Sequence, residues 1–243
     1  MKTTIDDFLG GKVKLAQGVD GYRSTSDSVL LASAVLAKKG ETVLDVGTGN
    51  GVVLFCLSAR IDGLEMTGLD VQSELLELAE KNNEINDKSV QFIEDDILNK
   101  ESKIKSLQFH HVVTNPPFYP EPHARFNEQQ RVAFHETISV DKWIRFCVKH
   151  VRAGGTFTMI HRMEALPDIL MALQKTALGA IEVIPLVKDL KTPAKRVIVR
   201  GKLGSKKPFQ LKNPFVLHVD GKNIYTESAE AVLRYGKALD EVL

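Results

Sequence analysis

The chain has 243 residues, of which 43% are hydrophobic and 26% are charged, and its formal net charge at pH 7 is +1. This length and composition predict one α/β domain over residues 1–243, in which residues 1–40 form an N-terminal segment preceding the core. The near-zero net charge excludes nucleic-acid binding through overall charge, so any such affinity requires a local basic patch.

Composition also indicates the setting of the protein. No apolar run approaches the roughly 18 residues that a membrane span requires, and residues 1–15 are mixed polar, unlike a signal peptide. The two cysteines, Cys56 and Cys147, lie in apolar stretches without metal-ligand spacing, and the seven histidines are scattered. We therefore expect a cytoplasmic protein, with a monomer favoured, that uses neither a metal nor a membrane.

Strand and helix patterns alternate along the chain in the order typical of βαβ units. They predict an α/β fold with a mostly parallel seven-stranded sheet, helices on both faces and a C-terminal antiparallel strand pair. A further helix, with its N-cap at Ser26 or Asp27, should precede the first strand. The expected strands are 43–46, 66–70, 89–93, 111–114, 156–161, 180–186 and 196–200, and the expected later helices are 51–60, 73–86, 141–151 and 166–176.

The first strand runs into a glycine-rich loop, Asp45-Val46-Gly47-Thr48-Gly49-Asn50-Gly51. Glycines permit unusual backbone angles and close approach of a ligand, and the free N–H groups of the next helix can face its polar atoms. Asp70 ends the next strand about 20 residues later, where a ribose-binding carboxylate is expected.

Two cofactors are compatible with this arrangement, because dinucleotide-binding dehydrogenases share its strand, loop, helix and acid. Asp45 and the GxGxG spacing favour S-adenosylmethionine, whose sulfonium and amino end are positive, whereas the carboxylate would repel a pyrophosphate. After the third strand, Asp96 would accept a hydrogen bond from the cofactor's adenine amine, and Ile97 would pack on its ring. A solvated helix cap is an equal alternative for the pair Asp95 and Asp96.

The fourth strand is followed by Asn115-Pro116-Pro117-Phe118, at the edge where open α/β sheets bind ligands. Two prolines stiffen this turn and remove two N–H donors. The Asn115 side-chain oxygen and the Pro116 carbonyl would accept hydrogen bonds from an exocyclic amine, and Phe118 would stack on the planar substrate. The pattern predicts direct methyl transfer to nitrogen; the alternative is an ordinary Pro-Pro loop with a buried Phe118.

These motifs resemble the class I S-adenosylmethionine-dependent methyltransferases of the amino-N type. More narrowly, the chain is similar to the bacterial adenine-N6 methyltransferases that modify valine tRNA beside its anticodon. Phe118, where some branches of that family have tyrosine, also resembles the ribosomal-RNA guanine-N2 enzymes. The similar flanking segments are 21–32, 131–136, 193–200, 225–226 and 231–234.

The resemblance implies a Rossmann-like class I methyltransferase fold, S-adenosylmethionine as cofactor and RNA, above all tRNA, as substrate. The catalytic residues would be Asn115, Pro116, Pro117 and Phe118. The cofactor-binding residues would be Asp45, Gly47, Thr48, Gly49, Gly51, Asp70, Val71, Asp96, Ile97 and Asn115. The substrate-binding residues would be Tyr22, Arg23, Asp27, Arg125, Arg131, Lys195 and Arg196.

The C-terminal third is locally basic, which suits contacts with RNA phosphates, although lysines on a strand edge are often only solvated. For Asp27, a simple helix cap is an alternative to a role at the site. Two other functions remain open. The Asn115-Pro116-Pro117-Phe118 turn, called the clamp below, also suits a protein glutamine-N5 methyltransferase, and a non-catalytic RNA-binding or cofactor-sensing protein could keep the fold. The basic residues are Lys191, Lys195, Arg196, Arg200, Lys202, Lys206, Lys207 and Lys212.

Overall fold

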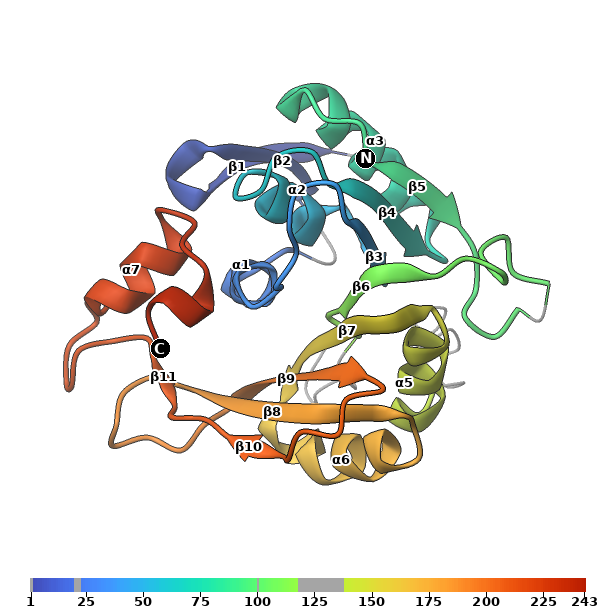
Figure 1. The fold of residues 1–243 in the computed structure, drawn as a ribbon. Coiled ribbons are helices and arrows are strands. Elements are labelled where there is room, and N and C mark those ends of the chain that lie inside the picture. The colour runs from blue at the N-terminus through green and yellow to red at the C-terminus, as the bar shows by residue number, and fades with distance from the viewer. Residues whose placement is uncertain (1, 20–22, 100, 118–137) are drawn as a thin grey trace, which may run out of the picture.

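The computed structural model describes residues 2–19, 23–99, 101–117 and 138–243. Within them, nine strands form one mixed sheet in the order β10-β8-β9-β7-β6-β3-β4-β5, with β11 paired to β8 (Figure 1). The seven central strands are β3 (Thr42–Val46), β4 (Glu65–Asp70), β5 (Gln91–Glu94), β6 (Phe109–Thr114), β7 (Val151–Arg162), β8 (Leu178–Val187) and β9 (Arg196–Leu203). Two short strands, β10 (Gln210–Leu211) and β11 (Phe215–Val216), pair with β8.

The strand directions confirm the expected α/β class. Strands β3 to β7 are parallel, and β9 is antiparallel to both β7 and β8, which gives the C-terminal antiparallel pair. The expectation did not include β10, β11 or an N-terminal hairpin of β1 (Thr3–Phe8) and β2 (Val13–Gly18). Strands of two residues carry no periodic pattern, so tertiary pairing alone defines β10 and β11.

Helices cover both faces of the sheet. Successive strand residues point to opposite faces, so Val43 and Val113 pack with α1, α2 and α7, whereas Leu44 and Val112 pack with α5 and α6. The helices are α1 (Ser26–Ser33), α2 (Val52–Ser58), α3 (Ser73–Asn86), α5 (Val140–Lys149), α6 (Leu166–Gln174) and α7 (Glu227–Leu233), and the 3₁₀ turns are η1 (Leu9–Gly11), η2 (Met163–Ala165) and η3 (Leu239–Glu241).

The start of α1 differs from expectation. Its N-cap is Thr25, whose hydroxyl accepts a hydrogen bond from the backbone N–H of Asp27 (3.3 Å). The predicted cap at Ser26 or Asp27 is therefore wrong, because Thr25 is the last extended residue and already supplies the capping oxygen. As a result, the Asp27 carboxylate is available to another element.

Side-chain amides of α3 attach the N-terminal hairpin to the core. Asn82 is fully buried; it accepts a hydrogen bond from the N–H of Ala16 (2.7 Å) and donates to the carbonyls of Ala16 (3.2 Å) and Asn50 (3.0 Å). Asn86 pairs with both backbone groups of Lys14 in the same way. The backbone N–H and C=O groups of Lys14 and Ala16 are thus hydrogen-bonded without another strand. Through Asn82, the hairpin is also connected to the glycine-rich loop.

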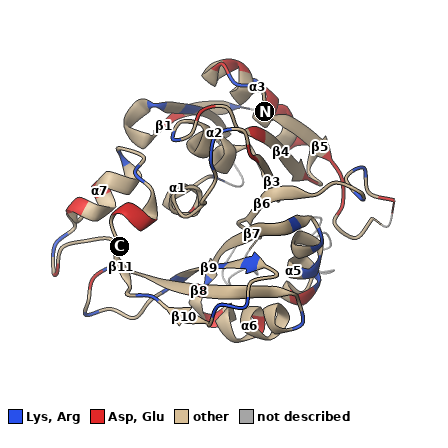
Figure 2. Cartoon of the chain, in the orientation of Figure 1, with Lys and Arg blue, Asp and Glu red and all other residues tan. Residues whose placement is uncertain are grey.

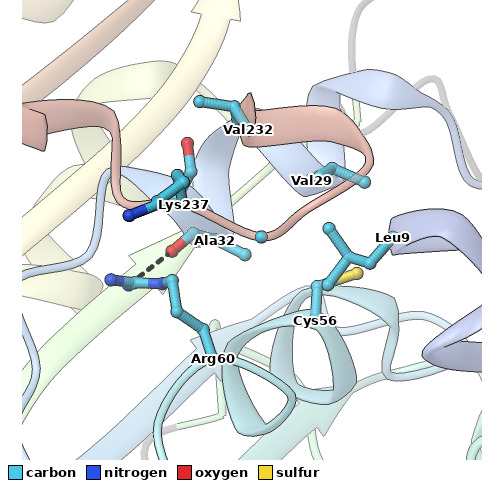
Figure 3. A pocket seen from close by; sticks show the side chains of 9 residues that line it. Leu9, Val29, Ala32, Cys56, Arg60, Val232 and Lys237 are labelled. Carbon is cyan, nitrogen blue, oxygen red and sulfur yellow. Dashed lines mark hydrogen bonds between the residues drawn. The ribbon is translucent and has the colours of Figure 1, made fainter. Parts of the chain in front are cut away.

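Figure 3 shows the junction where η1, α1, α2 and α7 meet around a cavity of about 10 Å³. The Arg60 guanidinium fills one side and donates to the carbonyls of Ala32 (2.9 Å) and Val35 (2.6 Å). Burial raises the pKa of the neighbouring Cys56 thiol to about 12, so this thiol is unreactive. A space of this size admits at most one water, so the junction is structural.

The described residues give no candidate for a membrane-spanning helix or for a cluster of metal-ligand side chains. No helix there is long and apolar enough to cross a bilayer. No group of three or more His, Cys, Asp or Glu side chains in the same residues is arranged to hold a metal ion.

Candidate active site

The glycine-rich loop folds over the end of β4. The N–H groups of Gly47 and Thr48 both donate to the Leu69 carbonyl (2.8 and 3.0 Å), and the N–H of Gly49 donates to the Asp70 carboxylate (2.8 Å). Gly47 and Gly49 have φ angles of +75° and +56°, a region that side chains with a Cβ disfavour. The loop and Asp70, predicted separately from the sequence, are therefore joined directly.

Gly51 has a different reason to be glycine. A Cβ at this position would lie 2.6 Å from the ring of Phe55 and 2.9 Å from the ring of Phe92. Its φ of +84° at the N-cap of α2 adds a backbone reason. Aromatic packing beneath the loop therefore excludes a larger residue here.

Asp45 is the most unusual group at this edge of the sheet. Its side chain is 1% exposed, and neither carboxylate oxygen has a hydrogen-bond partner among the described residues. Burial raises the pKa of Asp45 to about 7; the Asp70 charge adds to this rise, whereas the nearby Thr48 hydroxyl opposes it. An unpaired buried carboxylate is costly, so the site suits a ligand that brings positive charge or hydrogen-bond donors.

Asp70 and Val71 form the rim next to this carboxylate. Asp70 is 6% exposed, and its two oxygens accept hydrogen bonds from the N–H groups of Gly49 (2.8 Å) and Gln72 (3.0 Å). Burial raises the pKa of Asp70, and these N–H donors oppose the rise. Val71, by contrast, is 61% exposed, so an apolar surface lies beside the acid.

The structure separates the two acids that follow β5. Asp95 is buried and accepts hydrogen bonds from the N–H groups of Asp96 (2.9 Å) and Lys103 (2.7 Å) and from the Asn99 amide (2.9 Å). Asp96 is exposed and accepts from the N–H of Leu98 (2.8 Å) in a turn. No helix begins here, so the helix-cap alternative is wrong: Asp95 shapes the turn that presents Asp96.

Asn115 directly follows β6, and in the parallel register with β3, Asp45 pairs with Val113, two residues before it. Its side-chain oxygen is buried and has no hydrogen-bond partner in the described part of the chain. Pro116 is buried and Pro117 is exposed. The other residues expected at the site, Tyr22, Phe118, Arg125 and Arg131, lie outside the described residues.

Trp143 of α5 was not expected at the site. Its indole packs over Gly47, where a Cβ would lie 3.1 Å from the ring, and its N–H donates to the Thr114 hydroxyl (2.8 Å). That hydroxyl donates in turn to the Val46 carbonyl (2.7 Å). The residue before Asn115 is thereby connected to the glycine-rich loop. The one available signal is that this is the only tryptophan in the chain and follows the clamp.

We expect Trp143→Phe and Thr114→Val each to lower cofactor affinity several-fold. Stability should fall by about 1 kcal/mol in Trp143→Phe, which removes one buried hydrogen bond, and by about 2 kcal/mol in Thr114→Val, which removes two. Since both break the same bond, the double variant should lose less than the sum of the single losses. Calorimetric titration and denaturant unfolding of the three variants measure this coupling. Fully additive losses would show that the bond does not connect the two loops.

Two residues expected to contact substrate, Asp27 and Arg196, contact each other. The Arg196 Nε donates to the Asp27 carboxylate (2.9 Å), which joins the start of β9 to α1. Arg23 forms an ion pair with Asp6 and donates to the Gly18 carbonyl (3.2 Å), so it is engaged with the N-terminal hairpin.

The basic C-terminal residues divide between two opposite edges of the sheet. Because β9 is antiparallel, Arg196 lies beside the end of β7, whereas Lys202 lies beside Thr156 near the start of that strand. Six residues of strand separate the two by about 20 Å. Arg200, between them, is buried and pairs with Glu182 (2.5 Å) and Asp240 (2.7 Å). Lys195 and Arg196 therefore share the edge of the site, and Arg200 has a structural role.

Known methyltransferases are similar to this chain in sequence and in fold. The family model described as methyltransferase small domain matches residues 18–175. The tRNA1(Val) (adenine(37)-N6)-methyltransferase of Glaesserella parasuis is 24% identical over 187 residues, covering 76% of this chain and 78% of that protein. The release factor glutamine methyltransferase of Lactococcus lactis is 30% identical over 117 residues, or 48% and 37% of the two chains. An uncharacterized protein of Mycoplasma genitalium is 37% identical over 92 residues, and the matched segment spans 20% of its length.

Solved structures show the same fold. A predicted O-methyltransferase from Agrobacterium tumefaciens has a TM-score of 0.70 at 23% identity, covering 85% of this chain and 94% of that one. The 16S rRNA N2 methyltransferase of T. thermophilus, solved with AdoMet and guanosine, has a TM-score of 0.58 at 20% identity and covers 83% and 50%. The predicted Rossmann-like class I methyltransferase fold is confirmed. Because the family model covers more than half of the chain, this protein belongs to the methyltransferase small domain family.

Proposed function

We propose that the protein is an S-adenosylmethionine-dependent N-methyltransferase that methylates the exocyclic N6 amine of adenine in tRNA, at adenine 37 next to the anticodon of valine tRNA. Bound S-adenosylmethionine supplies a methyl group on a positively charged sulfonium. The observation that supports the proposal best is a pair of groups at one edge of the sheet that have no hydrogen-bond partner among the described residues: the Asp45 carboxylate and the Asn115 side-chain oxygen. One suits a cation, and the other suits an amine.

The residues of this edge fit the cofactor in chemistry. The buried Asp45 carboxylate suits the positive charge of the sulfonium and amino end. Asp70, with each oxygen accepting one N–H bond, keeps a lone pair on each for ribose hydroxyls. The exposed Val71 side chain and the Asp96 and Ile97 turn suit an adenine ring and its amine.

Asn115 would orient the substrate amine. The lone pair of an exocyclic amine is delocalised into the ring, so the amine is a poor nucleophile. Acceptance of its two N–H groups by the Asn115 oxygen and the Pro116 carbonyl localises that lone pair and directs it at the methyl group. The amine can lose a proton after methylation, so no side chain is needed as a general base before attack.

Coverage favours tRNA adenine over the glutamine alternative. The adenine-N6 relative aligns with 76% of this chain, whereas the release factor glutamine methyltransferase aligns with 48%. A ribosomal-RNA guanine-N2 activity is supported by the fold of the T. thermophilus enzyme. A cytoplasmic location and a monomeric state are parts of the proposal.

The experiment that tests this function uses RNA from cells that lack the protein. Labelled methyl from S-adenosylmethionine is transferred by the purified enzyme to tRNA and ribosomal-RNA fractions, and the nucleosides are identified by mass. N6-methyladenosine in tRNA is the expected product. N2-methylguanosine in ribosomal RNA would overturn the substrate but keep the chemistry. An absence of label in any RNA, with normal cofactor binding, would favour the glutamine substrate.

A further inference from the structure

Two arginines face each other at the edge of the sheet that carries Asn115. Arg162 ends β7 and Arg196 begins β9, and they are direct partners in the antiparallel register. Like charges directly opposite one another destabilise a strand pair unless an anion is present. Asp27 supplies one carboxylate, to Arg196. The Arg162 Nε is buried and has no hydrogen-bond partner within the described residues, so the corner formed by Arg162 and Arg196 retains a donor for an anion.

The neighbouring histidine, His161, adds no charge to this arginine pair. His161 is buried, and the pKa of its imidazole falls to about 4, mainly through burial, with the charges of Arg162 and Arg196 adding to the fall. It accepts a hydrogen bond from the N–H of Arg162 through Nδ1 (2.9 Å). Neutral at physiological pH, it stiffens the end of β7. Among the acids that face the corner, Asp27 is already paired and Glu164 is exposed.

A loop with three lysines lies at the same edge of the sheet as the arginine pair. Strand β8 is parallel to β7, so the loop that follows it, residues 188–195, emerges at the same edge and carries Lys188, Lys191 and Lys195 (Figures 1 and 2). Asp220 holds this loop by accepting from the N–H of Leu190 (3.3 Å) and the Lys191 ammonium (3.3 Å). The loop is thus built against the segment 217–226.

Large apolar side chains are exposed among these lysines. Leu190 is 70% exposed and Ile224 is 59% exposed, and both belong to the two joined segments. Behind Ile224, the rings of His218 and Tyr225 stack at 4.8 Å across an isolated strand bridge. A surface that combines cations with apolar groups suits unstacked nucleotides, which present both phosphates and flat apolar bases.

We propose that the carboxyl-edge track, formed by Arg162, Leu190, Lys191, Lys195, Arg196 and Ile224, binds the single-stranded RNA nucleotides that flank the methylated base. The proposal rests on the proposed function, since it identifies how an RNA substrate is held at the same site. In the sheet order, β9 is two strands and β8 three strands from β6, which Asn115 follows. At the usual strand spacing these are about 10 and 14 Å, within reach of neighbouring nucleotides.

The opposite edge of the sheet provides a matched control. Lys206 and Lys207 are exposed like Lys191 and Lys195, but the Lys207 carbonyl accepts a hydrogen bond from the N–H of Ala180 (3.1 Å) near the start of β8. This places the pair at the far end of the strands. Loss of two charges there changes the net charge of the protein equally, without touching the track.

The test compares the double variants Lys191→Ala/Lys195→Ala and Lys206→Ala/Lys207→Ala. The probe is an unmodified valine tRNA anticodon-arm oligonucleotide, titrated by fluorescence anisotropy at several salt concentrations. The track variant should lose roughly tenfold in RNA affinity and about 1.4 in the slope of log affinity against log salt, since each phosphate that a lysine neutralises adds about 0.7 to that slope. In methyl transfer, its KM should rise with little change in kcat. Cofactor affinity, measured by calorimetry, should be unchanged and shows that the variant is folded.

The control variant should stay within about twofold of the parent protein in RNA affinity. Equal losses in both variants would show that net charge alone acts, and would overturn the track. So would normal RNA affinity in the track variant while the parent protein binds and methylates the RNA. If the parent protein binds no RNA and labels a protein instead, the proposed function fails with the track. The two failures are therefore distinguishable.

Discussion

Replacement of Asn115 by alanine is expected to lower the rate of methyl transfer roughly a hundredfold to a thousandfold, the usual effect of removing one fixed hydrogen-bonding group at a reacting atom. The reason is the buried side-chain oxygen, which has no partner in the described part of the chain and is available to an amine. Single-turnover transfer to RNA measures the loss. Because alanine removes the acceptor without filling the loop, cofactor binding should be retained.

The variant Asn115→Asp separates hydrogen bonding from structure. Aspartate keeps an acceptor oxygen at the same position, so it should recover part of the activity that Asn115→Ala loses. Equal loss in both variants would point to a disturbed loop. Full activity of Asn115→Ala would show that the amine is not held by this side chain and would remove the basis of the proposed mechanism.

The second large effect is expected for Asp45→Asn, which should weaken S-adenosylmethionine binding about a hundredfold, or roughly 2.7 kcal/mol. The buried carboxylate has no hydrogen-bond partner among the described residues, so a cationic ligand is its natural partner. Calorimetric titration measures the loss. Glu84→Gln, a change of an exposed acid on α3, is the matched control and should leave affinity unchanged.

The raised pKa of Asp45 predicts how the stability of the protein without ligand depends on pH. The pKa of the Asp45 carboxyl rises from 3.8 to about 7 on folding. Between these values the folded protein holds a proton that the unfolded chain has lost, so this group makes stability fall as pH rises from about 4 to about 7. Above that range its contribution is level. Without ligand, Asp45→Asn should therefore be more stable than the parent protein at pH 8.

A cationic cofactor reverses the preference, because it binds the ionised carboxyl. Affinity of the parent protein should rise as pH increases through about 7, with release of up to one proton. Asp45→Asn should show a flat profile over the same range. Titrations between about pH 5 and pH 9 compare the two. A flat profile for the parent protein would show that Asp45 does not interact with the bound cation.

Elements that form within one continuous segment of the chain could be predicted from the sequence of that segment. The run around Asp45 predicted a strand and a loop, and the structure has both, because an apolar run followed by glycines has few alternatives. The helix 73–86 has the bounds expected from its spacing. In contrast, the cap of α1 was misplaced by at least one residue, since Thr25, Ser26 and Asp27 are all good capping types and only the backbone decides among them.

Contacts between segments that are far apart in the chain could not be predicted from the sequence. The position of Trp143 over Gly47 depends on the packing of α5 against the loop. No local pattern in the sequence connects these two residues. The pairing of Asp27 with Arg196 joins residues 169 positions apart. Likewise, a basic C-terminal third was visible, but only the antiparallel direction of β9 separates Arg196 from Lys202 by the length of the strand.

The sequence by itself determined the order of the seven strands β3 to β9 and of the helices α1, α2, α3, α5 and α6, the glycine-rich loop, and the presence of Asp45, Asp70 and Asn115 at strand ends. Periodicity and turn chemistry are local, so they can be read from neighbours in the chain. The tertiary structure alone decided which polar atoms are left without partners and which cations share the edge with Asn115. Burial and register depend on the whole sheet, and therefore on residues that no local pattern connects.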